Sequence, residues 1–182
     1  VQQPNVTVER EGIARIEPEG VRLKDGRLQP LDTLVLATGF QADRFIRPTQ
    51  VLGRKGVSLD DVWSTRPTAY YAVTIPNFPN FFMLNGPTGP VGNFSLIDIA
   101  ERQWAYVEQL LAPLREGDAL AVEPTAQAHA DYEERRVAAA RTTIFGSGCS
   151  SWYLDATGVP SSWPWSYEAF AEAMAAPIMD DY

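Results

Sequence analysis

Two short apolar runs that end at glycine-containing turns are the feature of this sequence that most constrains its fold. Residues 31–40 read LDTLVLATGF, and residues 78–87 read FPNFFMLNGP. A nearly continuous apolar run of this length predicts a buried strand, and the small residues at its end let another backbone or a flat ligand approach closely. Two such strands predict a sheet whose carboxyl ends share a crevice, where open α/β folds hold their cofactors.

The composition is that of an ordinary globular protein and excludes several function classes. The chain has 182 residues, of which 45% are hydrophobic and 21% charged, enough for one sizeable core. Fifteen Lys and Arg against 23 Asp and Glu give a net charge of −8, without a basic cluster, which argues against a nucleic-acid partner. No apolar stretch approaches the roughly 20 residues of a membrane span.

The residues that usually carry acid–base, nucleophilic or metal chemistry are scarce. Cys149 is the only cysteine, so no intrachain disulfide can form, which is compatible with a reducing cytosol and predicts a cytoplasmic protein. His129 is the only histidine and is predicted to be a solvated helix residue, so no metal site is expected. There is no Gly-x-Ser-x-Gly nucleophile elbow. No residue is assigned as catalytic.

The first 37 residues read as strands. Residues 6–9, 13–16 and 21–24 are β-rich, Asp25-Gly26 is a favoured hairpin turn, and the chain returns from residue 28 into a strand over 33–37. Residues 70–73 and 81–84 are two further predicted strands, inside and just after a long irregular connection. The expected fold class is α/β, with a β-meander and residual sheet strands packed by two long helices.

Helix signals dominate the second half of the chain. Ser95 opens a helix with Asp98 three residues on, and Pro113 is expected to close it. A second helix is predicted from Thr125 to about residue 145, and a short one over 167–174. The first helix is expected to bury the apolar residues that recur at helical spacing, which are Leu96, Ile97, Ala100, Trp104, Val107 and Leu111.

Three segments are candidates for a binding site. Ala37-Thr38-Gly39 leaves backbone N–H groups free at a strand end, although it could be a simple turn. The loop over 85–95 feeds a helix start, so its N–H groups and the positive helix end could face the pyrimidine edge of a flavin; the alternative is a flexible linker. The aromatic tail could line a substrate pocket or be packing; it contains Trp152, Tyr153, Trp163, Trp165 and Tyr167.

In these segments the chain resembles the carboxyl-terminal part of a class B flavoprotein monooxygenase. That family includes Baeyer–Villiger and flavin-containing monooxygenases. The run over 31–40 resembles the family's Ala-Thr-Gly crossover between its NADP and FAD domains, and the run over 78–87 resembles its Phe-Pro-Asn-x-Phe and Gly-Pro segment. Residues 150–153 are similar to its late Ser-Trp-Tyr element. Residues 163–165 and 180–182 are similar to the tail of the 4-hydroxyacetophenone monooxygenase branch.

The resemblance implies a two-dinucleotide-binding-domain, Rossmann-like flavoprotein. Residues 1–40 would be the end of the NADP domain, and residues 41–182 the C-terminal part of the FAD domain. The activity implied is insertion of one oxygen atom from O2 into a small ketone, amine or sulfide, through a C4a-(hydro)peroxyflavin and with NADPH. The residues implied to lie at FAD are Thr38, Gly39, Phe40, Asn85, Gly86, Pro87, Asn93, Phe94 and Ser95; those implied at the substrate are Phe94, Leu96, Trp152 and Tyr153.

The chain also departs from the family pattern. The sequence contains neither glycine fingerprint for a dinucleotide, and Gln41 stands where the family usually has Asp. We therefore expect that this chain alone does not retain FAD or NADPH and is inactive. Two other interpretations are a different two-dinucleotide flavoprotein reductase, and a catalytically inert fragment that forms a homodimer through an exposed sheet edge or apolar faces.

Overall fold

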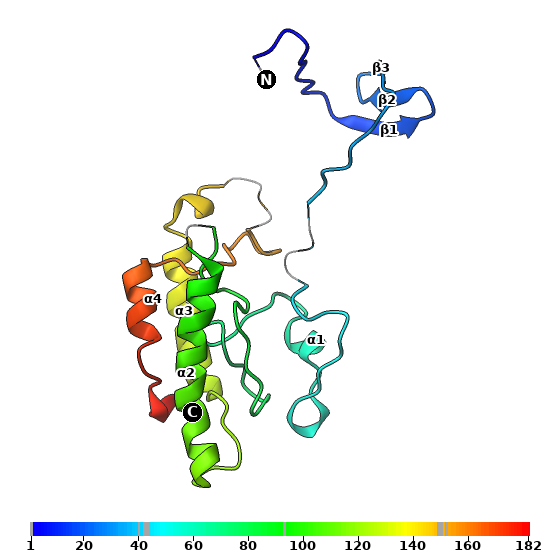
Figure 1. Cartoon of the computed structure of the whole chain (residues 1–182). Coiled ribbons are helices and arrows are strands. Elements are labelled where there is room, and N and C mark those ends of the chain that lie inside the picture. Colours follow the sequence, from blue (N-terminus) through cyan, green and yellow to red (C-terminus); the bar gives the residue numbers. More distant parts are fainter. Residues whose placement is uncertain (1, 40, 42–43, 93, 149–150, 152) are drawn as a thin grey trace. The chain divides into compact units, whose positions relative to one another are not determined.

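The structure, a computed structural model, describes residues 2–39, 41, 44–92, 94–148, 151 and 153–182. The chain divides into two units, residues 1–40 and residues 41–182 (Figure 1). Their assignment to an NADP and an FAD domain stays a prediction. None of the helices in the described part of the chain is both long and apolar enough to cross a membrane.

The first unit is built on a three-stranded antiparallel sheet. Strands β1 (Ile13–Glu17), β2 (Gly20–Leu23) and β3 (Leu28–Pro30) pair in the order β1-β2-β3. The β2–β3 turn follows from local chemistry, because Asp25 Oδ1 accepts the Arg27 N–H at 2.9 Å and Gly26 takes a left-handed φ of 90°. This sheet confirms the predicted meander.

The apolar run that ends at Gly39 forms no strand, contrary to prediction. Residues 33–39 have no ladder partner, and Val35 and Leu36 are 80% and 71% exposed. Residues 6–9 also form no strand. An apolar sequence becomes a buried strand only where neighbouring strands satisfy its backbone groups, and the described residues place none beside this run.

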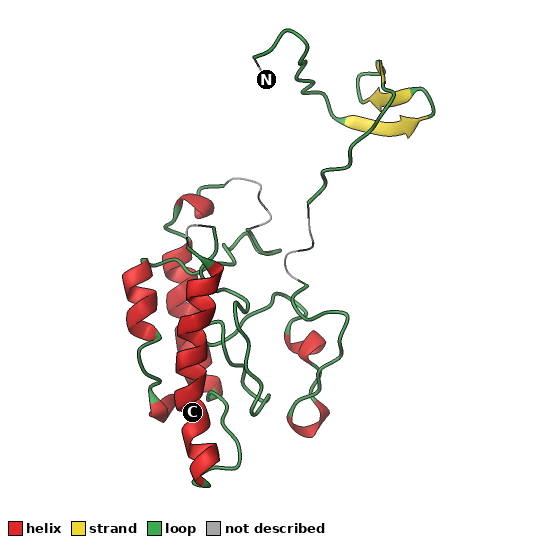
Figure 2. Ribbon diagram, in the orientation of Figure 1, coloured by secondary structure: helices red, strands yellow, loops and turns green. Residues whose placement is uncertain are grey.

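The second unit is helical (Figure 2). Its α-helices are α1 (Leu59–Val62), α2 (Leu96–Glu116), α3 (Ala126–Ala140) and α4 (Tyr167–Ala173), and its 3₁₀ helices are η1 (Arg54–Gly56), η2 (Ile144–Gly146) and η3 (Met179–Asp181). The side chains of Ser95, Thr125 and Ser166 accept N-cap hydrogen bonds for α2, α3 and α4. These caps confirm the predicted helix starts.

The buried face of α2 only partly matches the predicted one, because Val107 is buried as expected but the face is shifted around the helix. Its buried residues are Ile99, Gln103, Tyr106, Val107 and Leu110. Leu96, Ile97 and Trp104 of the predicted face are instead 52%, 74% and 50% exposed. The helix also runs past Pro113 and ends at Gly117, which is left-handed with a φ of 84°. Helical spacing alone allowed two adjacent apolar faces, and packing against α3 and α4 selected one of them.

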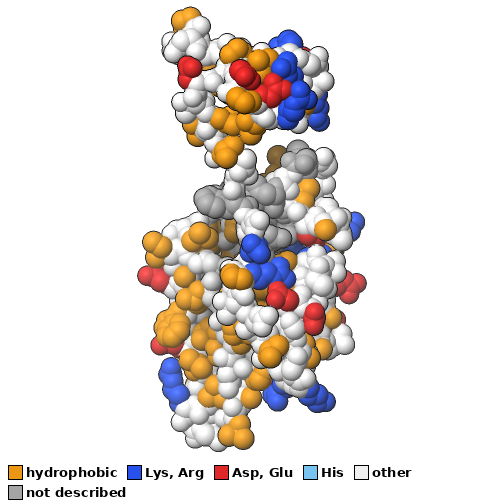
Figure 3. Space-filling view, turned by 90° about the vertical axis from the view of Figure 1, so that its right-hand side faces the viewer, with side chains coloured by type: hydrophobic (Ala, Val, Ile, Leu, Met, Phe, Trp, Pro, Cys, Tyr) orange, Lys and Arg blue, Asp and Glu red, His pale blue; other side chains and the backbone are white. Residues whose placement is uncertain are grey.

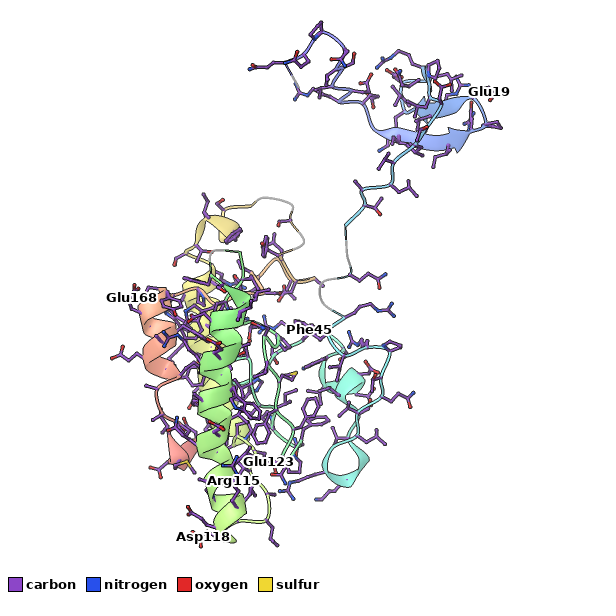
Figure 4. The ribbon with its side chains drawn as sticks, viewed as in Figure 1. Glu19, Phe45, Arg115, Asp118, Glu123 and Glu168 are labelled. Atoms are coloured by element: carbon purple, nitrogen blue, oxygen red, sulfur yellow. The ribbon has the colours of Figure 1, made fainter. Side chains whose placement is uncertain are left out.

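Helices α2, α3 and α4 pack into one helical layer, and α1 lies apart from them with a second apolar cluster. In Figure 1, α2 and α4 run in the same direction and α3 in the opposite one, and their buried side chains belong to one apolar cluster. Glu168 marks the start of α4, and Arg115 and Asp118 mark the far end of α2 (Figure 4). Hydrophobic side chains also reach the surface of this unit (Figure 3).

The strand predicted over 70–73 is a tight turn. Tyr71 and Ala72 take left-handed φ values of 49° and 62°, and Tyr70 pairs with Thr74 across the turn. Of the strand predicted over 81–84, only Phe82 makes a bridge, to Thr74. These residues are nonetheless central, because Tyr70 and Val73 belong to the core shared with α2, α3 and α4.

A cluster of tyrosines fastens the last residues to this core. The Tyr182 hydroxyl lies 3.0 Å from the Tyr106 hydroxyl and 3.2 Å from Thr74 Oγ1, and Tyr70 donates a hydrogen bond to Asp181. Burial raises the pKa of Tyr182 to about 12, and it also raises the pKa values of Tyr70 and Tyr106. The cluster is therefore held in its protonated form at neutral pH.

We expect the free energy of unfolding to fall as the pH rises above 10. Unfolded tyrosines lose their protons near pH 10, whereas the folded cluster keeps them, so alkali favours the unfolded state. Tyr182→Phe removes one of these groups. Between pH 10 and 12 it should make the decline shallower by at most about 1.4 kcal/mol per pH unit, one proton's worth. Urea unfolding at pH 9, 10 and 11 measures this; an unchanged pH dependence would contradict it.

Arg136 anchors α3 to the chain after residue 155. Its side chain is fully buried and makes two bonds to Glu133, at 2.6 and 3.0 Å, and one to the Pro160 carbonyl at 2.8 Å. Arg66 extends the network by pairing with Glu133 at 3.4 Å and with Asp155 at 3.1 Å. The network joins three segments that are distant in sequence.

Arg136→Met is expected to destabilise the protein by about 3–5 kcal/mol, because it leaves the buried Glu133 carboxylate short of its main partner. Arg135→Met is the matched control. Arg135 is the preceding residue of α3 but is exposed, and among the described residues its side chain bonds only to the Asp131 carbonyl, at 3.3 Å. Denaturant unfolding of both variants tests the difference, and equal losses would show that the buried network contributes nothing specific.

Candidate functional site

The loop over residues 85–92 is held from three sides. The Asn85 N–H donates to Gln103 Oε1 of α2 at 2.6 Å. The Gly86 N–H donates to the Ala72 carbonyl at 3.2 Å, and the Gly89 carbonyl accepts the Trp163 N–H at 3.0 Å. The predicted cofactor loop is therefore an anchored turn, and the alternative of a flexible linker does not describe it.

A glycine is required at position 86. A Cβ there would lie 2.3 Å from the Ala72 carbonyl oxygen, closer than atoms can approach. Gly86 and Pro87 are buried and Asn85 is half-buried, whereas Gly92 and Ser95 are exposed. Residues 85–87 support the loop from inside the unit, and its accessible part lies at residue 92 and the start of α2.

The first turn of α2 is tied to α4. Ser95 Oγ accepts the Asp98 N–H at 3.5 Å, a long N-cap bond. Tyr167 donates its hydroxyl hydrogen bond to Asp98, and Arg102 Nε lies 2.8 Å from the Tyr167 oxygen and 3.3 Å from Asp98. The Tyr167 hydrogen bond, aided by Arg102, lowers the pKa of Asp98. The α2 amino terminus is thus fixed by charged and aromatic contacts.

Three of the four predicted substrate residues lie within the described part of the chain. Phe94 is half-buried and stacks on Tyr167 with ring centroids 5.4 Å apart, and Leu96, two residues along the chain, is exposed. Tyr153 lies against the loop, because a Cβ on Gly92 would be 3.2 Å from its hydroxyl. Trp152, Asn93 and Phe40 lie outside the described residues. The role of each as a ligand contact stays a prediction.

Thr38 and Gly39 belong to the first unit. Both are exposed, and Gly39 has a left-handed φ of 83° with open space where a Cβ would be. Nothing obstructs a ligand at Gly39 itself, but the strand that was predicted to end at this turn does not form. That the turn lies beside the start of α2 stays a prediction.

The aromatic tail has a packing role in part. Trp163 is 8% exposed and belongs to the core cluster, where its ring contacts Trp165 at 4.6 Å and Phe170 at 5.4 Å. Trp165 and Tyr167 are half-buried around it. For Trp163 the packing interpretation is therefore confirmed.

His129 differs from its prediction as a solvated residue. It is half-buried, burial lowers its pKa, and its Nε2 has no hydrogen-bond partner within the described part of the chain. It lines a surface hollow of about 500 Å³ together with Arg66 and Glu133, which pair with each other. Among the described residues, no cluster of His, Cys, Asp and Glu could hold a metal ion.

Gln103 is the site residue that sequence reasoning missed. Its side chain is fully buried in α2, and its Oε1 accepts the N–H of Asn85, the first residue of the loop. A signal was present, since Gln103 lies four residues after Ile99 and seven before Leu110, on one helical stripe. A polar residue at a core position of a helix indicates a specific buried partner.

Comparison with known proteins points to one group of enzymes. No family model matches the chain. An uncharacterised monooxygenase of Mycobacterium tuberculosis is 42% identical over 166 residues, which span 91% of this chain and 34% of that protein. A Baeyer–Villiger monooxygenase of Pseudomonas aeruginosa is 35% identical over 82% of this chain and 29% of its own length. The chain thus spans about a third of the length of the curated relatives it matches.

Solved structures agree with these relatives. Cyclohexanone monooxygenase from Rhodococcus sp. Phi1, bound to NADP+, superimposes with a TM-score of 0.79 and 32% identity, over 96% of this chain and 34% of that one. Our chain has the fold of the C-terminal part of this enzyme. A steroid monooxygenase bound to NADP matches with a TM-score of 0.77 and 29% identity, over 90% of this chain and 31% of that one. The predicted α/β class is confirmed. The names of the relatives support the flavoprotein monooxygenase resemblance but not its 4-hydroxyacetophenone branch.

Gly86→Ala is expected to push the loop away from the 70–73 turn and to lower stability by about 1–3 kcal/mol. Gly117→Ala is the control: its φ of 84° is strained for alanine, but a Cβ there meets open space. It should cost about 1–2 kcal/mol without moving the loop. Hydrogen exchange of the amides over 85–92 should accelerate in the first variant only. Equal exchange in both would contradict a steric requirement at Gly86.

Proposed function

We propose that the full-length protein containing this chain is an FAD- and NADPH-dependent monooxygenase that inserts one atom of O2 into a small organic substrate. The observation that carries this proposal is the similarity to NADP+-bound cyclohexanone monooxygenase over nearly the whole chain. The relatives named Baeyer–Villiger or FAD-binding monooxygenases favour a ketone substrate over an amine or sulfide. A two-dinucleotide flavoprotein reductase is the second candidate, because it would use the same cofactors.

The residues of this chain fit one edge of a flavin. The amino end of α2 is capped by Ser95 and is exposed there, so its partial positive charge is available to an electron-rich carbonyl edge. Gly92 adds an exposed backbone without a side chain. FAD when bound would supply the oxygen chemistry. The protein groups would orient the ring and, through Phe94 and Leu96, border the substrate and exclude water.

The exposed apolar face of α2 supports a larger assembly. Ile97 and Trp104 form a surface that the described residues leave uncovered, as they leave Val35 and Leu36. We propose that these surfaces pack against the rest of the full-length enzyme, which in the relatives is about two thirds of the protein. A homodimer of the chain through the same surfaces is the competing proposal.

Absorption spectra with added FAD test the cofactor proposal. The full-length protein should show a flavin band that survives gel filtration, whereas residues 1–182 alone should not, because no glycine fingerprint for the pyrophosphate occurs in their sequence. The purified full-length enzyme should then consume NADPH and O2 with cyclohexanone and yield a lactone. NADPH oxidation without an oxygenated product would favour the reductase. Faster turnover of 4-hydroxyacetophenone would support that branch.

A further inference from the structure

Gln103 and Asn85 connect α2 to the loop through two hydrogen bonds. Gln103 Oε1 accepts the backbone N–H of Asn85 at 2.6 Å, from a side chain with no solvent exposure. Asn85 Nδ2 donates back to α2, to the Leu96 carbonyl at 3.2 Å. Asn85 has a left-handed φ of 52°, which asparagine tolerates better than most residues. The turn that begins the loop is thus set from α2 at two points.

Two polar atoms of this pair are buried without a partner among the described residues. They are Gln103 Nε2, a donor, and Asn85 Oδ1, an acceptor. The opposite assignment of either amide would place N–H against N–H or C=O against C=O, so the orientations follow from the bonds already made. Buried polar groups are normally satisfied, and a single water molecule can accept from one and donate to the other. The pair therefore has the chemistry of a buried water site.

We propose that Gln103 is a positioning residue for the flavin-facing loop: its carboxamide, with one buried water bridging Nε2 to Asn85 Oδ1, sets the turn at Asn85 and thereby the course of residues 85–92. The inference rests on the proposed function for what the loop faces. Gln103 touches no ligand and acts through Asn85. Its loss changes how well the loop fits the flavin, besides any effect on stability.

Three variants of the full-length protein separate these effects. Gln103→Met keeps the length of the side chain and removes both hydrogen bonds. Gln103→Glu is the conservative variant, because burial favours a protonated carboxyl, which can accept from Asn85 and donate in place of Nε2. Gln109→Met is the matched control: Gln109 is an exposed residue of α2 whose Nε2 also bridges to another segment, at the Ala175 carbonyl.

FAD affinity, the visible flavin spectrum and thermal stability are measured for each variant at a temperature where all are folded. Gln103→Met should weaken FAD binding at least tenfold and shift the flavin band, while Gln109→Met leaves both unchanged. Gln103→Glu should restore binding at pH 6 and lose it as the pH rises. The proposal would be overturned if the Gln103→Met enzyme kept the wild-type FAD affinity and flavin spectrum, whatever its melting temperature.

The remaining outcomes also either support or overturn the proposal. If Gln103→Met does not fold, hydrogen exchange of the Asn85 amide in the wild-type protein gives the answer, because an unprotected amide would overturn the inference and a strongly protected one supports it. Failure of the wild-type protein to bind FAD at all would instead refute the proposed function. These two failures are distinguished by the wild-type titration alone.

Discussion

The close approach of the Gly86 backbone to the Ala72 carbonyl is the constraint on which the larger unit depends. It joins the turn over 70–73, whose Tyr70 and Val73 enter the core of the helical layer, to the loop that leads into α2. Because neither side chain nor solvent fits between these backbones, the loop cannot relax without moving the core. The loop and the core that it contacts therefore hold the exposed start of α2 rigidly in place.

Buried polar groups give that support its specificity. Gln103 holds the beginning of the loop, Arg136 joins α3 to the chain beyond residue 155, and Tyr182 closes a hydroxyl cluster with Tyr106 and Thr74. Each places a polar atom inside an otherwise apolar layer, where a missing partner is costly. Such groups select one arrangement of the elements, whereas apolar packing alone would tolerate several.

Part of the fold and site could be predicted from the sequence, and the division follows the range of the interactions. The hairpin at Asp25-Gly26 and the caps at Ser95 and Thr125 depend on neighbours within a few residues, so their patterns sufficed. The prediction of a strand over 33–37 was wrong, because a strand needs pairing partners, and a single apolar run does not specify them. The predicted buried face of α2 was right only for Val107 among its fully buried residues, since two adjacent faces carry apolar residues at helical spacing.

The sequence by itself determined the hairpin turn at Asp25-Gly26 and the helix starts, because turn conformation and capping act over short distances. Only the tertiary structure decided that Gln103 meets Asn85, that Trp163 is core, and that Leu96, Ile97 and Trp104 remain exposed. Those outcomes depend on which elements pack against each other. The summed burial of distant segments decides which elements pack together, and the spacing of apolar residues within one segment does not determine it.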